Sequence, residues 1–136
     1  HRLPKVNHPV YYGGPILTNV VGVLHSTDFI LNSTNTLTED KVGFTLDRKM
    51  LEVIAKGQGP KNKLITLGMA NWTTGQLEEE LEHPRNPAMS WLIMDYDEKF
   101  VFGQLDEDKP DDLWERSVSE AIRAKTREIT SKVFKD

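Results

Sequence analysis

The chain has 136 residues, enough for one globular core, and with 38% hydrophobic and 28% charged residues its composition is typical of a folded protein. It contains no cysteine, which excludes disulfide frameworks, thiol nucleophiles and cysteine-ligated metal centres. No apolar run approaches the roughly 20 residues that a membrane-spanning helix needs. We therefore expect a single domain over residues 1–136, cytoplasmic and without a membrane partner.

The net charge of −4 at pH 7 argues against bulk electrostatic binding to nucleic acid. The charge is unevenly distributed: residues 1–75 carry 8 Lys and Arg against 5 Asp and Glu, whereas residues 76–136 carry 9 against 16. Residues 116–135 are locally basic, with 6 Lys and Arg against 2 Glu. Direct DNA binding is not expected, and this basic end is the segment that can offer a local contact to nucleic acid or to an acidic partner.

Short runs of β-branched, aromatic and aliphatic residues predict strands. They lie at residues 10–12, 20–25, 29–31, 42–46, 64–69, 91–94 and 100–102. Gly13, Gly14 and Pro15 end the first run with a turn, because glycine tolerates positive φ and proline fixes φ. Residues 32–41, rich in Ser, Thr and Asn, predict a loop or an edge strand.

Asp47 is a suitable N-cap for a first helix over residues 48–56, in which Met50, Leu51 and Ile54 share one face and after which Gly57 stands at the usual stop.

Two further helices are predicted. Thr73 and Gln76 have capping-box spacing and open a helix over residues 77–81 that Pro84 ends. A long C-terminal helix is predicted over residues 111–134 from an apolar stripe. The stripe consists of Trp114, Val118, Ile122, Ile129 and Val133. Short strands interspersed with helices indicate an α+β fold.

Several segments occur in an order and spacing that characterise a known family. They are V-Y-Y-G-G-P-I from Val10, G-V-L-H from Gly22, L-G-M-A-N-W from Leu67 running into G-Q-L-E-E-E-L from Gly75, and Trp91-Leu92. Together they resemble the bacterial YqgE/AlgH family, over about Val10 to Trp114. Two departures are visible: members begin with a further segment, so this chain is expected to be N-terminally truncated, and Asn71 replaces a small residue.

The resemblance implies a compact α+β domain in which a small, partly closed β-barrel-like sheet is flanked by helices. It implies a transcriptional regulator of uncharacterised biochemical function. Because the acidic balance and the lack of a helix-turn-helix or zinc-finger pattern disfavour direct DNA binding, we expect such a regulator to act indirectly, through an unknown protein partner or a small ligand. It implies no cofactor and no established reaction, and we favour a protein that is not an enzyme.

The family motifs single out seven candidate binding-site residues, and for each a structural role is the simpler interpretation. They are Gly13, Gly14, His25, Trp72, Gln76, Glu80 and Trp91. The glycines suit a turn, the histidine a structural hydrogen bond, Gln76 a capping box, Glu80 an ion pair with a cation from the sheet, and the tryptophans core packing. No catalytic, cofactor-binding or metal-binding residue is assigned.

Two groups of neighbouring residues resemble catalytic or metal sites, but structural roles are the simpler interpretation. His25, Ser26 and Asp28 are too close in sequence to converge as a triad, and Glu79 with His83 lacks a further ligand.

Two alternatives stay open. The first is a small-molecule-binding protein or an unrecognised enzyme, with a pocket near the W-x-x-G-Q-L-E-x-E segment lined by His25, Trp72, Gln76 and Glu80. The second is self-association through an open sheet edge that the absent N-terminal segment would leave.

Overall fold

The computed structural model describes residues 4–85 and 91–103, and within the C-terminal segment residues 118, 119, 122, 123, 126, 127 and 129–132. The chain divides into two units, His1–Asn71 and Trp72–Asp136, and each is described by itself. The mixed content of strands and helices confirms the α+β class.

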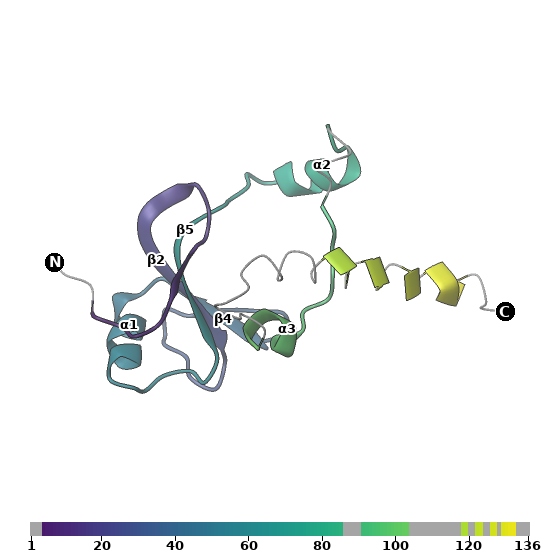
Figure 1. The fold of residues 1–136 in the computed structure, drawn as a ribbon. Helices are drawn as coiled ribbons and strands as arrows, with labels where there is room; N and C mark the ends of the chain where they lie inside the picture. Colours follow the sequence, from purple (N-terminus) through teal and green to yellow (C-terminus); the bar gives the residue numbers. More distant parts are fainter. Residues whose placement is uncertain are drawn as a thin grey trace. The chain divides into compact units, whose positions relative to one another are not determined.

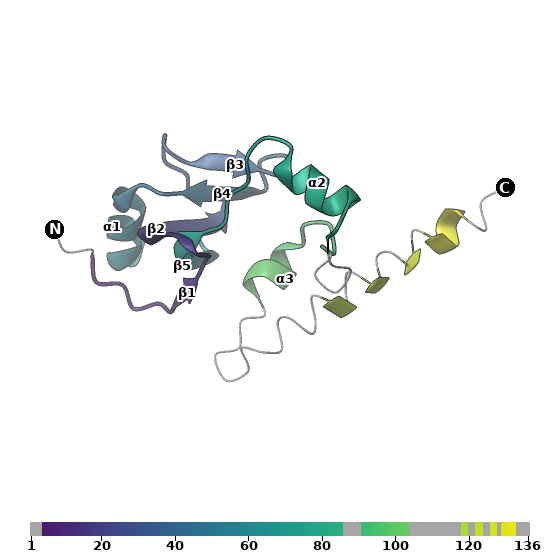
Figure 2. The same ribbon diagram turned by 90° about the horizontal axis from the view of Figure 1, so that it is seen from above.

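The first unit is built on a five-stranded sheet in the order β1-β5-β2-β4-β3 (Figures 1 and 2). The strands are β1 (Val10–Tyr12), β2 (Ile16–Ser26), β3 (Asn35–Leu37), β4 (Val42–Thr45) and β5 (Lys63–Met69). β1 runs parallel to β5, and the other pairs are antiparallel.

The sheet is open, so the expected partly closed barrel is wrong for the described part of the chain. β1 and β3 form the two edges, and each has only three residues, which offers few ladder hydrogen bonds for closure. β3 confirms the edge strand expected in the segment rich in Ser, Thr and Asn.

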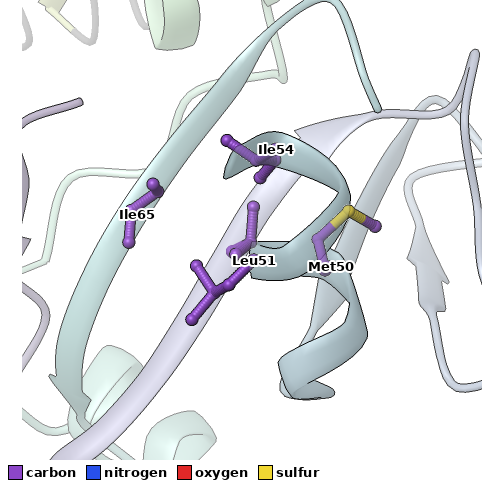
Figure 3. Close-up of a cluster of buried hydrophobic side chains, with 5 residues drawn as sticks. Met50, Leu51, Ile54 and Ile65 are labelled. Carbon is purple, nitrogen blue, oxygen red and sulfur yellow. The ribbon is translucent and has the colours of Figure 1, made fainter. Parts of the chain in front are cut away.

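One helix supplies half of the core of this unit. α1 (Arg48–Ala55) buries Met50, Leu51 and Ile54 against Val23 of β2 and Ile65 of β5, and Figure 3 shows the α1 side chains beside the strand that carries Ile65. Val23 and Ile65 are register partners, so they present one apolar surface to the helix. The predicted face of the helix is therefore confirmed.

Both ends of α1 are closed as the sequence predicts. The Asp47 carboxylate accepts a hydrogen bond from the Lys49 backbone N–H at 2.9 Å. Gly57 adopts a φ of +76° and donates its N–H to the Ile54 carbonyl at 2.9 Å, a conformation that favours glycine.

Three predicted strands are wrong. Residues 29–31 form no strand; the Thr34 hydroxyl accepts the Leu31 N–H at 2.9 Å and closes a local turn instead, while Phe29 and Leu31 pack on the core from outside the sheet. Residues 91–94 have no regular secondary structure. Residues 100–102 are helical, because Asp97 accepts the Phe100 N–H at 2.9 Å and nucleates a helix.

The second unit contains α2 (Gln76–Glu82) and α3 (Glu98–Phe102) among its described residues. The predicted C-terminal helix falls largely outside the described residues; those described between 118 and 132 are helical. No helix in the described ranges is long and apolar enough to cross a lipid bilayer.

Candidate functional site

A carboxylate held between two indole rings is the central feature of the second unit. The Nε1–H groups of Trp72 and Trp91 both donate to Glu80 Oε2, at 3.3 and 3.0 Å. The two rings meet edge to face, with centroids 5.5 Å apart and planes at 70°. Three of the sequence-predicted candidates therefore converge on one oxygen atom.

The start of α2 places this carboxylate. Gln76 Oε1 accepts the backbone N–H of Thr73 at 3.0 Å and the Thr73 hydroxyl at 3.2 Å, so the expected side-chain contact between these residues is present. The N-cap, however, is Gly75 with a φ of +81°, and Gln76 is the first helical residue. The capping box therefore forms only in part, because the left-handed Gly75, and not Thr73, is the N-cap, and the helix begins at Gln76, one residue before the predicted range.

A pocket of about 490 Å³ lies beside this arrangement. Its walls come from one face of α2, from the two residues after His83, and from the indole of Trp91. The lining residues are Gln76, Glu79, Glu80, His83, Pro84, Arg85 and Trp91. Three of the seven sequence candidates, Gln76, Glu80 and Trp91, thus line one pocket.

The remaining lining residues are not among the expected site residues, and the sequence carries a signal for two of them, Glu79 and His83. Gln76, Glu79, Glu80 and His83 follow the i, i+3, i+4, i+7 spacing of one helix face, so they share a side of α2. Glu79 and His83 do lie on one wall as that spacing requires. The described residues contain no group of three or more metal-ligating side chains.

The charge of the pocket wall is mixed. Glu79 and Glu80 contribute two carboxylates, and Arg85 contributes one guanidinium. The expected ion pair between Glu80 and a cation of the sheet is absent among the described residues, where Glu80 instead accepts two neutral indole N–H groups. The carboxylate is thus oriented without being paired to an opposite charge from the described part of the chain.

His25 lies in the interior of the first unit. Its side chain is 0% exposed, Nδ1 donates to the Ser26 carbonyl at 2.8 Å, and Nε2 is 2.8 Å from the Thr45 hydroxyl. The Thr45 hydroxyl in turn lies 2.7 Å from that of Thr34. Both ring nitrogens are engaged, so the imidazole has no free surface or donor to offer a ligand.

Gly13 and Gly14 lie where two backbones touch. The Gly13 N–H donates to the Leu67 carbonyl at 2.7 Å, and a Cβ at Gly13 would stand 2.3 Å from the Gly68 carbonyl oxygen. A Cβ at Gly14 would stand 2.2 Å from the carbonyl carbon of Met69. Contact between the β1–β2 turn and the end of β5 therefore accounts for both glycines.

Comparison with known proteins places this chain in a family. A "UPF0301 protein" of Bradyrhizobium sp. is 41% identical over 102 residues, which cover 75% of this chain and 45% of that protein. A "UPF0301 protein" of Rickettsia akari is 40% identical over 106 residues, covering 78% and 51% respectively. This chain therefore spans about half the length of the curated relatives it matches.

The fold has a solved counterpart. The solution structure of the AlgH protein from Pseudomonas aeruginosa is similar with a TM-score of 0.63 and 30% sequence identity, over 84% of this chain and 55% of that chain. The model of the AlgH-like family matches residues 1–124, which include both the glycine turn and the tryptophan–glutamate arrangement. On these grounds the chain belongs to the AlgH-like family.

Proposed function

We propose that this chain is a cytoplasmic binding module that regulates transcription indirectly, through a protein or small ligand bound at the pocket beside Glu80 and Trp91. Family membership supports the regulatory part, since the sequence resemblance carries that expectation. The binding part depends on one observation, the fixed Trp72–Glu80–Trp91 arrangement in a pocket wall.

The arrangement suits recognition because its groups are held before any ligand arrives. Two N–H donors on one oxygen fix the Glu80 carboxylate, and the edge-to-face contact fixes both rings. Trp91 nevertheless remains 49% exposed, so its ring retains a surface that a ligand can cover. Pockets that combine an aromatic wall with a few oriented polar groups are the usual form of small-ligand sites.

A second function is favoured less by the structure. The alternative from the sequence is a small-molecule-binding protein or an unrecognised enzyme with a pocket lined by His25, Trp72, Gln76 and Glu80. The His25 ring is completely buried and offers no reactive group to such a pocket. The binding proposal therefore keeps the pocket of the second unit and leaves His25 out of it.

The indole N–H signals of Trp72 and Trp91 test the proposal. In a Trp114→Phe background these two tryptophans are the ones that remain. We expect fragments drawn from neutral aromatic, cationic and anionic classes to include some that shift both indole cross-peaks in ¹⁵N–¹H NMR spectra. Trp91→Leu should abolish the response, whereas Glu82→Gln, on α2 but outside the pocket lining, should preserve it. Fragments that shift neither signal would contradict a binding role.

A further inference from the structure

The two oxygens of the Glu80 carboxylate differ in the hydrogen bonds that they accept. Both indole N–H groups go to Oε2, which occupies its two lone-pair directions. Within the described ranges of the chain, Oε1 receives no donor, and no cationic side chain lies within ion-pair distance of this carboxylate. Since neutral donors leave the formal charge in place, Oε1 presents a negative, fixed acceptor at a half-buried position.

Other residues that line the pocket add two features. Glu79 lines the same pocket and contributes a second carboxylate, and Trp91 contributes a half-exposed ring. The face of an indole ring attracts cations, and a planar cation can stack on it while donating N–H groups to a carboxylate. These features together favour a group that is positively charged, planar and rich in N–H donors.

We propose that the pocket, whose binding role is the function proposed above, takes a guanidinium group that stacks on Trp91 and donates to Glu80 Oε1 and to Glu79. The group can belong to a free small molecule or to an arginine side chain of a partner protein. Guanidinium fits better than ammonium because it is planar and more weakly hydrated. Arg85 lines the same pocket and would repel a second cation near itself. It suits a ligand whose positive end lies towards Glu80 and whose carbonyl or carboxylate lies towards Arg85.

Titration with matched probes tests the chemistry. The full chain carrying Trp114→Phe is titrated with N-acetylarginine amide, N-acetylcitrulline amide, N-acetyllysine amide and N-acetylglutamate amide, and the indole N–H signals are followed. Citrulline keeps the shape of arginine but lacks its charge, so we expect the arginine probe to bind at least about tenfold more tightly. Lysine should lie between the two. Equal affinity for arginine and citrulline, or preference for the glutamate probe, would overturn the proposal.

Variants of Glu80 and Glu79 test whether these two carboxylates bind the arginine probe. Glu80→Gln retains an acceptor for the indole groups but removes the charge, and it should weaken the arginine probe about tenfold or more. Should this variant fold poorly, Glu79→Gln, whose carboxylate accepts no hydrogen bond from either indole N–H, should also weaken binding. Glu82→Gln is the matched control and should leave binding unchanged. Unchanged affinity in a folded Glu80→Gln and in Glu79→Gln would refute the assignment.

Two further ligands distinguish a free small molecule from a protein side chain as the source of the guanidinium group. The full set of titrations also distinguishes failure of the guanidinium proposal from failure of the binding function. Agmatine represents a free small molecule, and the peptide Gly-Gly-Arg-Gly-Gly represents a protein side chain; binding of either one supports a guanidinium site and identifies its source. If the citrulline or glutamate probe shifts the indole signals and the arginine probe does not, the pocket binds ligands but not guanidinium. If no probe shifts them, the binding function and the guanidinium class both fail.

Discussion

At the scale of single residues, a series of hydrogen bonds around His25 gives both nitrogens of the buried imidazole a partner inside the first unit. The Ser26 carbonyl can only accept, so Nδ1 carries a hydrogen, and in the neutral ring Nε2 then accepts from the Thr45 hydroxyl. Thr45 then accepts from the Thr34 hydroxyl, whose oxygen accepts the Leu31 N–H. Every hydroxyl hydrogen therefore has one direction, and the neutral Nδ1–H tautomer is the form that fits.

Removal of this ring should be costly. His25→Ala leaves a cavity and strips a partner from the buried Thr45 hydroxyl and the Ser26 carbonyl, so we expect a loss of about 2–4 kcal/mol in the free energy of unfolding. Urea denaturation measures it, and His8→Ala, at an exposed site, should change stability by less than about 0.5 kcal/mol. Nitrogen NMR of the wild-type ring should show hydrogen on Nδ1; a ring with hydrogen on Nε2 would contradict the chain of donors.

At the scale of elements, a small network joins the end of β2 to the segment that begins β5. The Ser26 hydroxyl donates to Asp28 Oδ1 and accepts the Asn62 N–H at 3.0 Å, while Asp28 Oδ2 accepts the Lys61 N–H at 3.0 Å. The hydrogen bond from Ser26 is the main cause that lowers the pKa of Asp28 below its ordinary value of 3.8. The carboxylate form thus holds the two chain segments together.

The lowered pKa of Asp28 predicts the direction of acid sensitivity. A carboxyl whose pKa is lower in the folded state stabilises that state fully above its unfolded pKa, and the contribution is lost as the pH falls through the folded pKa. We therefore expect the free energy of unfolding to decline below about pH 3.8. The hydrogen bond from the Lys49 backbone N–H also lowers the pKa of Asp47, so protonation of Asp47 should contribute to the same decline.

Urea denaturation at a series of pH values measures this decline. Asp28→Asn should flatten the acid limb of the stability profile, because it removes one of the groups whose protonation causes the loss. Glu39→Gln is the control at an exposed carboxyl outside the network and should follow the wild-type profile. An Asp28→Asn profile identical to that of the wild type would show that the network does not couple to protonation.

At the scale of the whole chain, the charge distribution bears on the indirect regulatory role proposed above. The net charge is −4. Residues 116–135 are locally basic, whereas the rest of residues 76–136 carries more Asp and Glu than Lys and Arg. Phosphate neutralisation supplies most non-specific DNA affinity, so a chain with this balance lacks the main driving force. Regulation through a bound ligand or partner is consistent with that charge.

Gel-shift titration over a range of salt concentrations tests the indirect role. We expect no shift of duplex DNA by micromolar protein at about 0.15 M salt, since phosphate contacts weaken steeply as salt rises. A known basic DNA-binding protein at the same concentration serves as the positive control. Tight binding with a steep salt dependence would show a direct contact and would contradict the indirect mechanism.

Local patterns determined much of the fold. Asp47 and Gly57 mark the two ends of α1 as predicted, because cap chemistry acts within a few residues. The apolar runs at β2, β4 and β5 coincide with buried positions of those strands, whereas β1 is mostly exposed. The runs at residues 29–31 and 100–102 failed for the same local reason, since the hydroxyl of Thr34 and the carboxylate of Asp97 bind nearby N–H groups and replace a strand by a turn and a helix.

For the candidate site, the sequence by itself determined that Gln76 and Glu80 share a helix face and that the chain resembles the AlgH-like family. Only the tertiary structure decided that Trp91, eleven residues beyond Glu80, returns its indole N–H to the same oxygen as Trp72, and that His25 lies inside. Helix spacing is a property of neighbouring residues. The return of a non-helical segment, the openness of the sheet and the burial of a polar ring depend on contacts between distant residues, which periodicity does not encode.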